Sequence, residues 1–113
     1  MQSPTTTNIQ ISTDRKKLDI DYIHDFLSKS YWAKGIPKSL VERSIENSFC
    51  FGIFQNKQQI GFARVVTDYT TFGFLADVFV DTSKRGNGYG RILVDYILNH
   101  DDLKDLRRWH LLT

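Results

Sequence analysis

Cysteine, proline and glycine are scarce in this chain, and long apolar stretches are missing. Its 113 residues include one cysteine, two prolines and seven glycines. A single cysteine excludes an internal disulfide and any cysteine-cluster metal site, and it is typical of a reducing compartment. So few glycines and prolines exclude collagen-like and low-complexity chains. No apolar run approaches the roughly 20 residues of a membrane helix and the N-terminus has no signal-peptide core, so we expect a cytoplasmic protein without membrane contact.

The charges of the chain are nearly balanced. Fifteen lysines and arginines against thirteen aspartates and glutamates leave a formal net charge of +2. That excess is too small to indicate nucleic acid as a partner. Hydrophobic residues make up 41% of the chain, which predicts a packed core and argues against intrinsic disorder. The length fits one domain, since ordinary domains cluster around ~100–150 residues.

The spacing of apolar residues predicts strands and helices in the order β-α-α-β-β-β-α-β. Residues 1–7 are polar and are expected to form a flexible tail, and a short strand is expected over 8–13. Two helices follow, one capped by Asp19 and ending near Ser30, the other beginning after Pro37. The remaining predicted elements are strands over 49–54, 60–69 and 72–80, a helix over 88–100 and a strand over 107–113.

Short turns join the three central strands. Parallel neighbours cannot be connected by turns of this length, so these strands form an antiparallel meander. Apolar side chains occur on both faces of the strands, which indicates that helices cover both sides of the sheet. The predicted fold class is therefore α/β (α+β), with a mixed but mostly antiparallel sheet flanked by helices.

Glycines gather in one place, where residues 84–91 read Lys-Arg-Gly-Asn-Gly-Tyr-Gly-Arg. A predicted strand ends just before this segment and an amphipathic helix begins within it. Such a junction aims unpaired backbone N–H groups and the positive end of the helix dipole at one point, and glycine lets a ligand approach the backbone. With the basic residues, this is typical of a phosphate or pyrophosphate site. The alternative is a glycine-rich turn whose basic side chains are merely solvated.

Two common nucleotide motifs do not fit this segment. The dinucleotide fingerprint G-x-G-x-x-G requires glycine where Arg91 or Leu93 stands, and it expects a parallel βαβ context. The P-loop pattern ending in G-K-[ST] is absent from the sequence. Both nucleotide interpretations are therefore excluded.

The pattern that fits is R-x-x-G-x-G, at Arg85, Gly88 and Gly90. It follows the strand segment Ala-Asp-Val-Phe-Val at 76–80. The loop, this strand and the element order together resemble the GNAT superfamily of N-acetyltransferases, whose fourth strand leads directly into a loop that binds the pyrophosphate of coenzyme A.

The resemblance implies an N-acetyltransferase that uses acetyl-CoA as cosubstrate. The acetyl group would pass directly to a primary amine of a small molecule or peptide. In the family, the backbone of the fourth strand pairs with the pantetheine arm and the loop amides hold the pyrophosphate. Carried onto this sequence, the cofactor-binding residues are Val78, Phe79, Val80, Arg85, Gly86, Asn87, Gly88, Tyr89 and Gly90.

Asp77 is the candidate catalytic residue. An ammonium group has no lone pair, so the site must remove a proton from it, and a carboxylate acting directly or through water is a usual base. Asp77 lies on the fourth strand beside the expected thioester, between Ala76 and Val78. The alternative is an edge carboxylate paired with Arg64 on the neighbouring strand. Asp68, at the far end of the third strand, is more typical of a turn residue.

Tyr31 and Trp32 are the candidate substrate residues. They lie in the loop between the first two helices, which the family commonly uses to recognise the acceptor. The alternative is that they form a lid over the core.

Cys50, between two phenylalanines, is predicted to be a buried thiol rather than a nucleophile. No metal site is predicted, because the three histidines share no ligand spacing.

GNAT domains usually continue after the fifth strand into a helix and a closing hairpin. This chain ends at Thr113, so we expect a GNAT-like domain over 8–113 that lacks them. An uncovered sheet edge there predicts a homodimer through the C-terminal half.

The alternative function is a catalytically impaired CoA-binding or interaction module of GNAT type. A third hypothesis, an anion- or nucleic-acid-binding domain, predicts strongly salt-dependent binding and indifference to coenzyme A.

Overall fold

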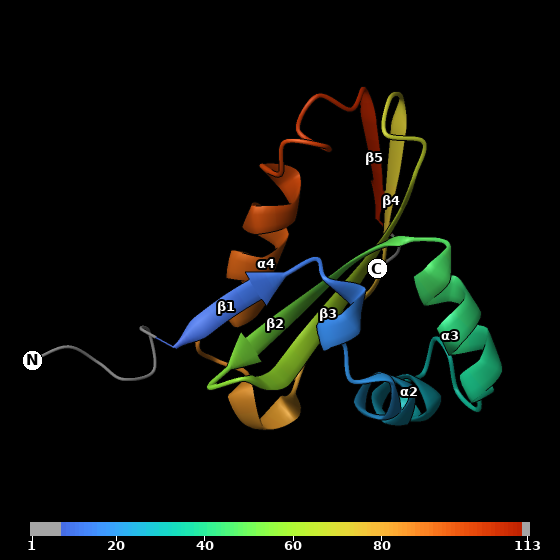
Figure 1. The fold of residues 1–113 in the computed structure, drawn as a ribbon, viewed down its shortest axis with the longest axis vertical. Coiled ribbons are helices and arrows are strands. Elements are labelled where there is room, and N and C mark those ends of the chain that lie inside the picture. Colours follow the sequence, from blue (N-terminus) through green and yellow to red (C-terminus); the bar gives the residue numbers. More distant parts are fainter. Residues whose placement is uncertain (1–7, 112–113) are drawn as a thin grey trace, which may run out of the picture.

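The computed structural model describes residues 8–111, and the predicted tail at 1–7 lies outside this range, as do residues 112 and 113. Within it, five strands form one sheet in the spatial order β1-β2-β3-β4-β5 (Figure 1). This agrees with the predicted fold class and element order. The elements are β1 Ile9–Ser12, η1 Arg15–Lys17, α2 Ile20–Lys29, α3 Lys38–Glu46, β2 Phe49–Gln55, β3 Gln58–Thr67, β4 Phe72–Val80, η2 Thr82–Lys84, α4 Tyr89–Leu98 and β5 Arg108–Leu111.

The strands β1 to β4 pair antiparallel, as the meander predicts, whereas β5 pairs parallel to β4. The parallel pairing is short. It runs from the pair Phe72–Arg108 to the pair Leu75–Leu111. Within residues 8–111, no strand pairs with the β5 side of β4 beyond Leu75. The second half of β4 therefore has an open backbone edge.

A bulge interrupts β4 in this second half. The pairs Phe62–Phe79 and Arg64–Ala76 leave Asp77 and the residue after it opposite a single residue of β3. Asp77 has a φ of 52°, in the left-handed region that an aspartate tolerates better than most residues. An extra residue in one strand reverses the alternation of side chains beyond it. The bulge therefore decides which way the side chains after Asp77 point.

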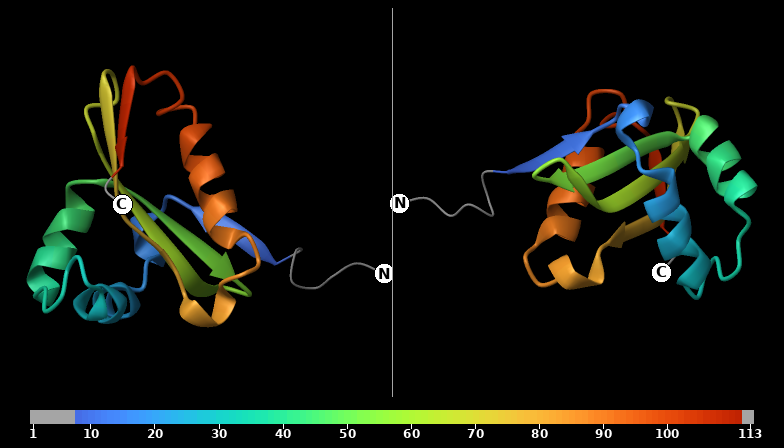
Figure 2. Two further views of the ribbon diagram at one scale, coloured as in Figure 1. Left: turned by 180° about the vertical axis from the view of Figure 1, so that it is seen from behind. Right: turned by 60° about the horizontal axis from the view of Figure 1, so that its bottom comes forward.

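Helices cover both faces of the sheet, as the sequence predicts. Figure 2 shows α4 on one side and the α2–α3 pair on the other. Beyond the bulge, Val78 and Val80 pack on the α4 side, whereas Phe79 packs on the α2–α3 side. The α4 core contains Phe51, Ile53, Val65, Leu75, Tyr89, Leu93, Ile97 and Leu103 among its buried residues, and the α2–α3 core contains Ile23, Leu27, Val41, Ile45, Cys50, Phe62 and Phe79.

The spacing of apolar residues predicts one stripe of Tyr89, Leu93, Tyr96 and Ile97 on α4, and Tyr96 departs from it. Tyr89, Leu93 and Ile97 are buried as expected, but Tyr96 is 43% exposed. It lies at the border of the stripe, where its ring still meets Phe51 edge-on with centroids 6.1 Å apart.

None of the helices within residues 8–111 combines the length and the apolar character that a bilayer crossing requires.

Asp19 caps α2, as the sequence predicts. Its Oδ1 accepts a hydrogen bond from the backbone N–H of Tyr22 at 3.0 Å. We expect Asp19→Ala to lower the free energy of unfolding by ~1 kcal/mol, because an N–H in the first turn loses its acceptor. Urea denaturation followed by circular dichroism measures this. The control is Asp25→Ala, which removes an exposed carboxylate paired with Lys29 on the same helix and should cost less than ~0.5 kcal/mol. Equal losses in the two variants would contradict the capping role.

Cys50 is a core thiol, as predicted, with 2% of its surface exposed. Burial raises the pKa of this thiol to about 11. Because the thiolate is the reactive form, little of it exists at pH 8 in the folded protein. We expect iodoacetamide at pH 8 to alkylate Cys50 rapidly in urea and only very slowly in native buffer, as followed by intact-mass spectrometry. Similar rates in the two conditions would show that the thiol is accessible and ionised in the fold.

Candidate functional site

The glycine segment forms the connection between η2 and α4. Gly86 and Gly88 have φ values of 86° and 78°, which glycine reaches at little cost. Gly88 is also the N-cap of α4. A Cβ atom built on either glycine would meet no heavy atom within 4 Å. The loop conformation therefore depends on these two glycines, and the space in front of them is open to a ligand.

Backbone N–H groups gather at this loop. Since α4 begins at Tyr89, the N–H groups of its first turn have no acceptor within the helix, and the positive end of its dipole faces the loop. Among the described residues, the N–H groups of Gly86, Asn87 and Gly88 also meet no acceptor. A succession of unpaired N–H groups at a helix N-terminus is typical of an anion site.

Side chains brace the loop from within. The Nε of Arg85 donates to the carbonyl of Val80 at 3.3 Å, and the Nδ2 of Asn87 donates to the carbonyl of Lys84 at 3.0 Å. The side chain of Tyr89 points away into the α4 core and is only 6% exposed. At Tyr89, as at the loop glycines, only the backbone is therefore available to an anion.

The open edge of β4 leads away from this loop. The side chains of Val78 and Val80 pack on the α4 core, and Phe79 stacks on Phe26 of α2 with ring centroids 3.8 Å apart. Packing engages these three side chains, although Val78 also lines the pocket described below. Their backbone, in the extended form that pairs with another extended chain, is available to a ligand.

Asp77 lies at the other end of this edge and is held by two donors. The Nε of Arg64 donates to Oδ2 at 2.8 Å, and the indole Nε1 of Trp32 donates to Oδ1 at 3.0 Å. Arg64 also donates from Nη1 to the Oγ of Ser48 at 3.1 Å. Only 15% of the Asp77 side chain and 20% of the Arg64 side chain are exposed. The ion pair that the alternative interpretation of Asp77 predicts is therefore present, together with an unexpected tie to the α2–α3 loop.

Asp77 and Arg64 line a pocket of about 660 Å³. Both predicted substrate residues reach it, with Tyr31 85% and Trp32 41% exposed. The Trp32 ring also meets Phe26 at a centroid distance of 6.4 Å, so it partly covers the core as well. The described residues that line it are Tyr31, Trp32, Arg64, Phe74, Leu75, Ala76, Asp77, Val78, Val94 and Leu111.

The sequence did not indicate several of the residues that form this pocket or support it. Phe74, Val94 and Leu111 come from β4, α4 and β5, and nothing in their local sequence indicates that they share a pocket. The alternation at the end of the chain predicts Trp109, Leu111 and Thr113 on one face of the last strand. Thr113 lies outside the described residues, and Leu111 is 63% exposed and lines the pocket. Nothing in the sequence indicates a role for Ser48, because its hydroxyl oxygen accepts a hydrogen bond from Arg64, which lies 16 residues away.

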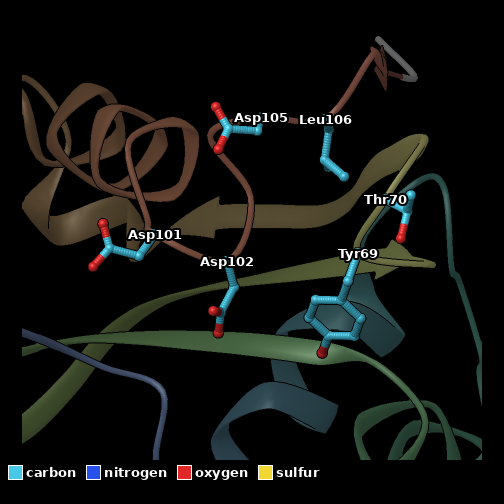
Figure 3. A pocket seen from close by; sticks show the side chains of 6 residues that line it. All are labelled: Tyr69, Thr70, Asp101, Asp102, Asp105 and Leu106. Atoms are coloured by element: carbon cyan, nitrogen blue, oxygen red, sulfur yellow. The ribbon is translucent and has the colours of Figure 1, made fainter.

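A second cavity, of about 770 Å³, lies at the opposite end of β4 from the glycine loop. Figure 3 shows Asp101, Asp102 and Asp105 of the α4–β5 connection across from Tyr69 and Thr70 of the β3–β4 turn. In the range 8–111, no three histidine, cysteine or acidic side chains are arranged to hold a metal ion.

Asp68 belongs to the same turn and has a structural role there. Its Oδ1 accepts hydrogen bonds from the backbone N–H groups of Thr70, Thr71 and Phe72. The Thr71 hydroxyl and these amides hold the pKa of Asp68 well below its usual value. Asp68 is therefore a turn residue, as the sequence predicts.

Comparisons with known proteins agree with this geometry. A family model described as the acetyltransferase (GNAT) family matches residues 20–112. The chain is 31% identical to "Putative acetyltransferase FG08082" of Gibberella zeae, over 99% of this chain and 75% of that protein.

Solved structures lead to the same family. A GNAT-family protein (xcc2953) of Xanthomonas campestris pv. campestris is 49% identical and superposes with a TM-score of 0.90, over 93% of this chain and 75% of that one. The ribosomal-protein-S18-alanine N-acetyltransferase of Escherichia coli, at 19% identity, shares the fold with a TM-score of 0.65 over 80% of this chain and 57% of that one. The chain belongs to the GNAT family of acetyltransferases.

Proposed function

We propose that the protein transfers the acetyl group of acetyl-CoA directly to a primary amine of a small molecule or peptide. One observation carries this proposal. The open backbone edge of β4, at residues 78–80, connects the anion-binding loop at 85–90 to the pocket that holds Asp77. A ligand with a pyrophosphate at one end, an extended polar arm and a reactive acyl group at the other fits that order of features.

Acetyl-CoA has this construction. Its pyrophosphate would accept hydrogen bonds from the N–H groups of residues 86–90, and such bonds to a charged oxygen contribute ~1.5–3 kcal/mol each. Arg85 adds a positive charge beside them. The pantetheine arm would pair with the backbone of Val78, Phe79 and Val80 as an additional strand. A backbone N–H on this edge would polarise the thioester carbonyl and stabilise the oxyanion that develops on it.

Asp77 would act as the base. The acceptor enters as an ammonium ion, which gives one proton to the carboxylate directly or through a water molecule. The nitrogen lone pair then attacks the thioester carbonyl, a C–N bond forms, the C–S bond breaks and coenzyme A leaves as its thiolate. The second proton lost by the nitrogen passes to this thiolate, directly or through water. Arg64 and Trp32 hold the carboxylate at the pocket wall during these steps.

A homodimer through the C-terminal half stays a prediction. Two features support it. In the described part of the sheet β5 is an edge strand, and edge strands invite pairing with another chain. Ile92, Tyr96 and Leu111 also expose apolar surface in that half.

Gly88→Asp tests the position of the pyrophosphate. The new carboxylate would stand in the open space before the loop and repel the phosphates, and we expect the Kd for acetyl-CoA to rise at least ~100-fold, the equivalent of ~2.7 kcal/mol. Isothermal titration calorimetry measures this.

The matched control is Gly35→Asp. Gly35 has a φ of 75°, and its Cβ would likewise meet nothing within 4 Å, so both variants carry the same charge and the same backbone strain. Gly35 lies in the α2–α3 loop, away from the glycine segment. Its substitution should leave the Kd within about threefold. An unchanged Kd for Gly88→Asp would remove the loop from the cofactor site.

Asp77→Asn tests the base. Asparagine keeps an oxygen that can accept from Trp32 or Arg64, but it cannot take a proton from the acceptor. We expect turnover to fall by ~10²–10⁴-fold while the Kd for acetyl-CoA stays within a few-fold. Coenzyme A release in the presence of a panel of amines gives the turnover, and calorimetry gives the Kd. Asp95→Asn makes the same change on the exposed face of α4 and should alter neither.

The same measurements separate the alternative function. The carboxylate of Asp77 is already neutralised by Arg64, and this observation favours a module that binds coenzyme A without efficient transfer. Binding of acetyl-CoA without turnover on any amine would support that module. Absence of acetyl-CoA binding would reject both functions.

A further inference from the structure

We propose that the acceptor is a monoamine with an apolar or aromatic body, and that polyamines are excluded. This inference deepens the proposed function, because it takes the pocket of about 660 Å³ as the place where the acceptor meets the thioester. It concerns only the chemistry of that pocket.

The charge of the pocket limits the number of ammonium groups that it can hold. Of the described residues that line the pocket, only Arg64 and Asp77 are charged, and they face each other at 2.8 Å. Asp77 is therefore the one carboxylate that this described lining offers to an ammonium ion. A second ammonium ion brought into this pocket would lose its water without gaining a counterion, and an unpaired buried charge is strongly unfavourable.

The rest of the lining suits an apolar body. Phe74, Val94 and Leu111 present hydrocarbon surface from three different elements. Tyr31 is 85% exposed, although it packs edge-on against Trp32 with centroids 5.2 Å apart. An aromatic ring with so much free surface gains contact when an apolar ligand covers it.

Trp32 fixes the orientation of such a ligand. Its indole N–H is bound to Asp77 at 3.0 Å, so its ring lies beside the carboxylate that would receive the proton. An acceptor whose body rests on Tyr31 and Trp32 would place its amino group close to Asp77. The aromatic pair and the base thus belong to one recognition surface.

The acidic cavity at Asp101, Asp102 and Asp105 is the competing place for a polycation. It shares no lining residue with the proposed acceptor pocket. It also lies at the far end of β4 from the glycine loop (Figure 1). A polyamine bound there would not present its nitrogen to Asp77.

The experiment compares 2-phenylethylamine with spermidine. At saturating acetyl-CoA we expect kcat/KM, measured by coenzyme A release, to be at least tenfold higher for 2-phenylethylamine. Calorimetric titration of each amine into the protein should give the same order of Kd. Tyr31→Ala should lower kcat/KM for 2-phenylethylamine about tenfold, mainly through KM. The control Tyr69→Ala removes an exposed tyrosine from the acidic cavity and should change this value less than twofold.

Other outcomes overturn the inference and remain distinct from failure of the proposed function. Preference for spermidine, with a loss of that activity in Asp105→Asn, would assign acceptor binding to the acidic cavity and leave acetyl transfer intact. Failure of 2-phenylethylamine to bind, with normal acetyl-CoA binding, would reject the acceptor class alone. Amine binding without any acetyl-CoA binding would support the pocket assignment and reject the cosubstrate.

Discussion

The bulge at Asp77 is the constraint on which the rest of the site depends. Without the extra residue, strict alternation along β4 would put Phe79 on the α4 side and turn Val78 and Val80 toward α2. With it, Phe79 stacks on Phe26 and the two valines complete the α4 core. Among residues 8–111, the pairing of β4 with β5 ends at Leu75, shortly before this residue, and no described strand pairs with the edge beyond it.

A left-handed backbone at a non-glycine residue costs roughly 1–2 kcal/mol, so something must offset it. The carboxylate of Asp77 accepts from both Arg64 and Trp32, and hydrogen bonds to a charged group contribute ~1.5–3 kcal/mol each. One donor comes from β3 and the other from the α2–α3 loop. The bulge conformation is therefore stabilised by the same contacts that hold the α2–α3 loop at the pocket. The proposed cofactor edge and the proposed acceptor pocket share these contacts.

Local signals made the element order and the position of the glycine loop predictable from the sequence. Asp19 begins a helix because its carboxylate reaches an amide three residues away, and the glycines at 86 and 88 mark positive φ values within a single turn. The bulge and the pocket depend instead on contacts over long separations. Asp77 meets Arg64 13 residues away and Trp32 45 residues away. The sequence offers Arg64 as an alternative partner because it lies on the neighbouring strand, but nothing in β4 indicates the contact with Trp32. An aspartate between apolar residues is equally compatible with regular alternation.

The division between backbone and side chains at the site explains how one fold supports different acceptors. At the loop and along β4, the groups proposed to bind acetyl-CoA are mainly amides and carbonyls, while Val78, Phe79, Val80 and Tyr89 commit their side chains to packing. Conservative changes in those side chains leave the backbone pattern intact. The proposed acceptor pocket, in contrast, is built from side chains that the fold does not require, such as the exposed ring of Tyr31. Specificity can therefore change there without disturbing either core, and a shared fold at 19% identity carries no information about the acceptor.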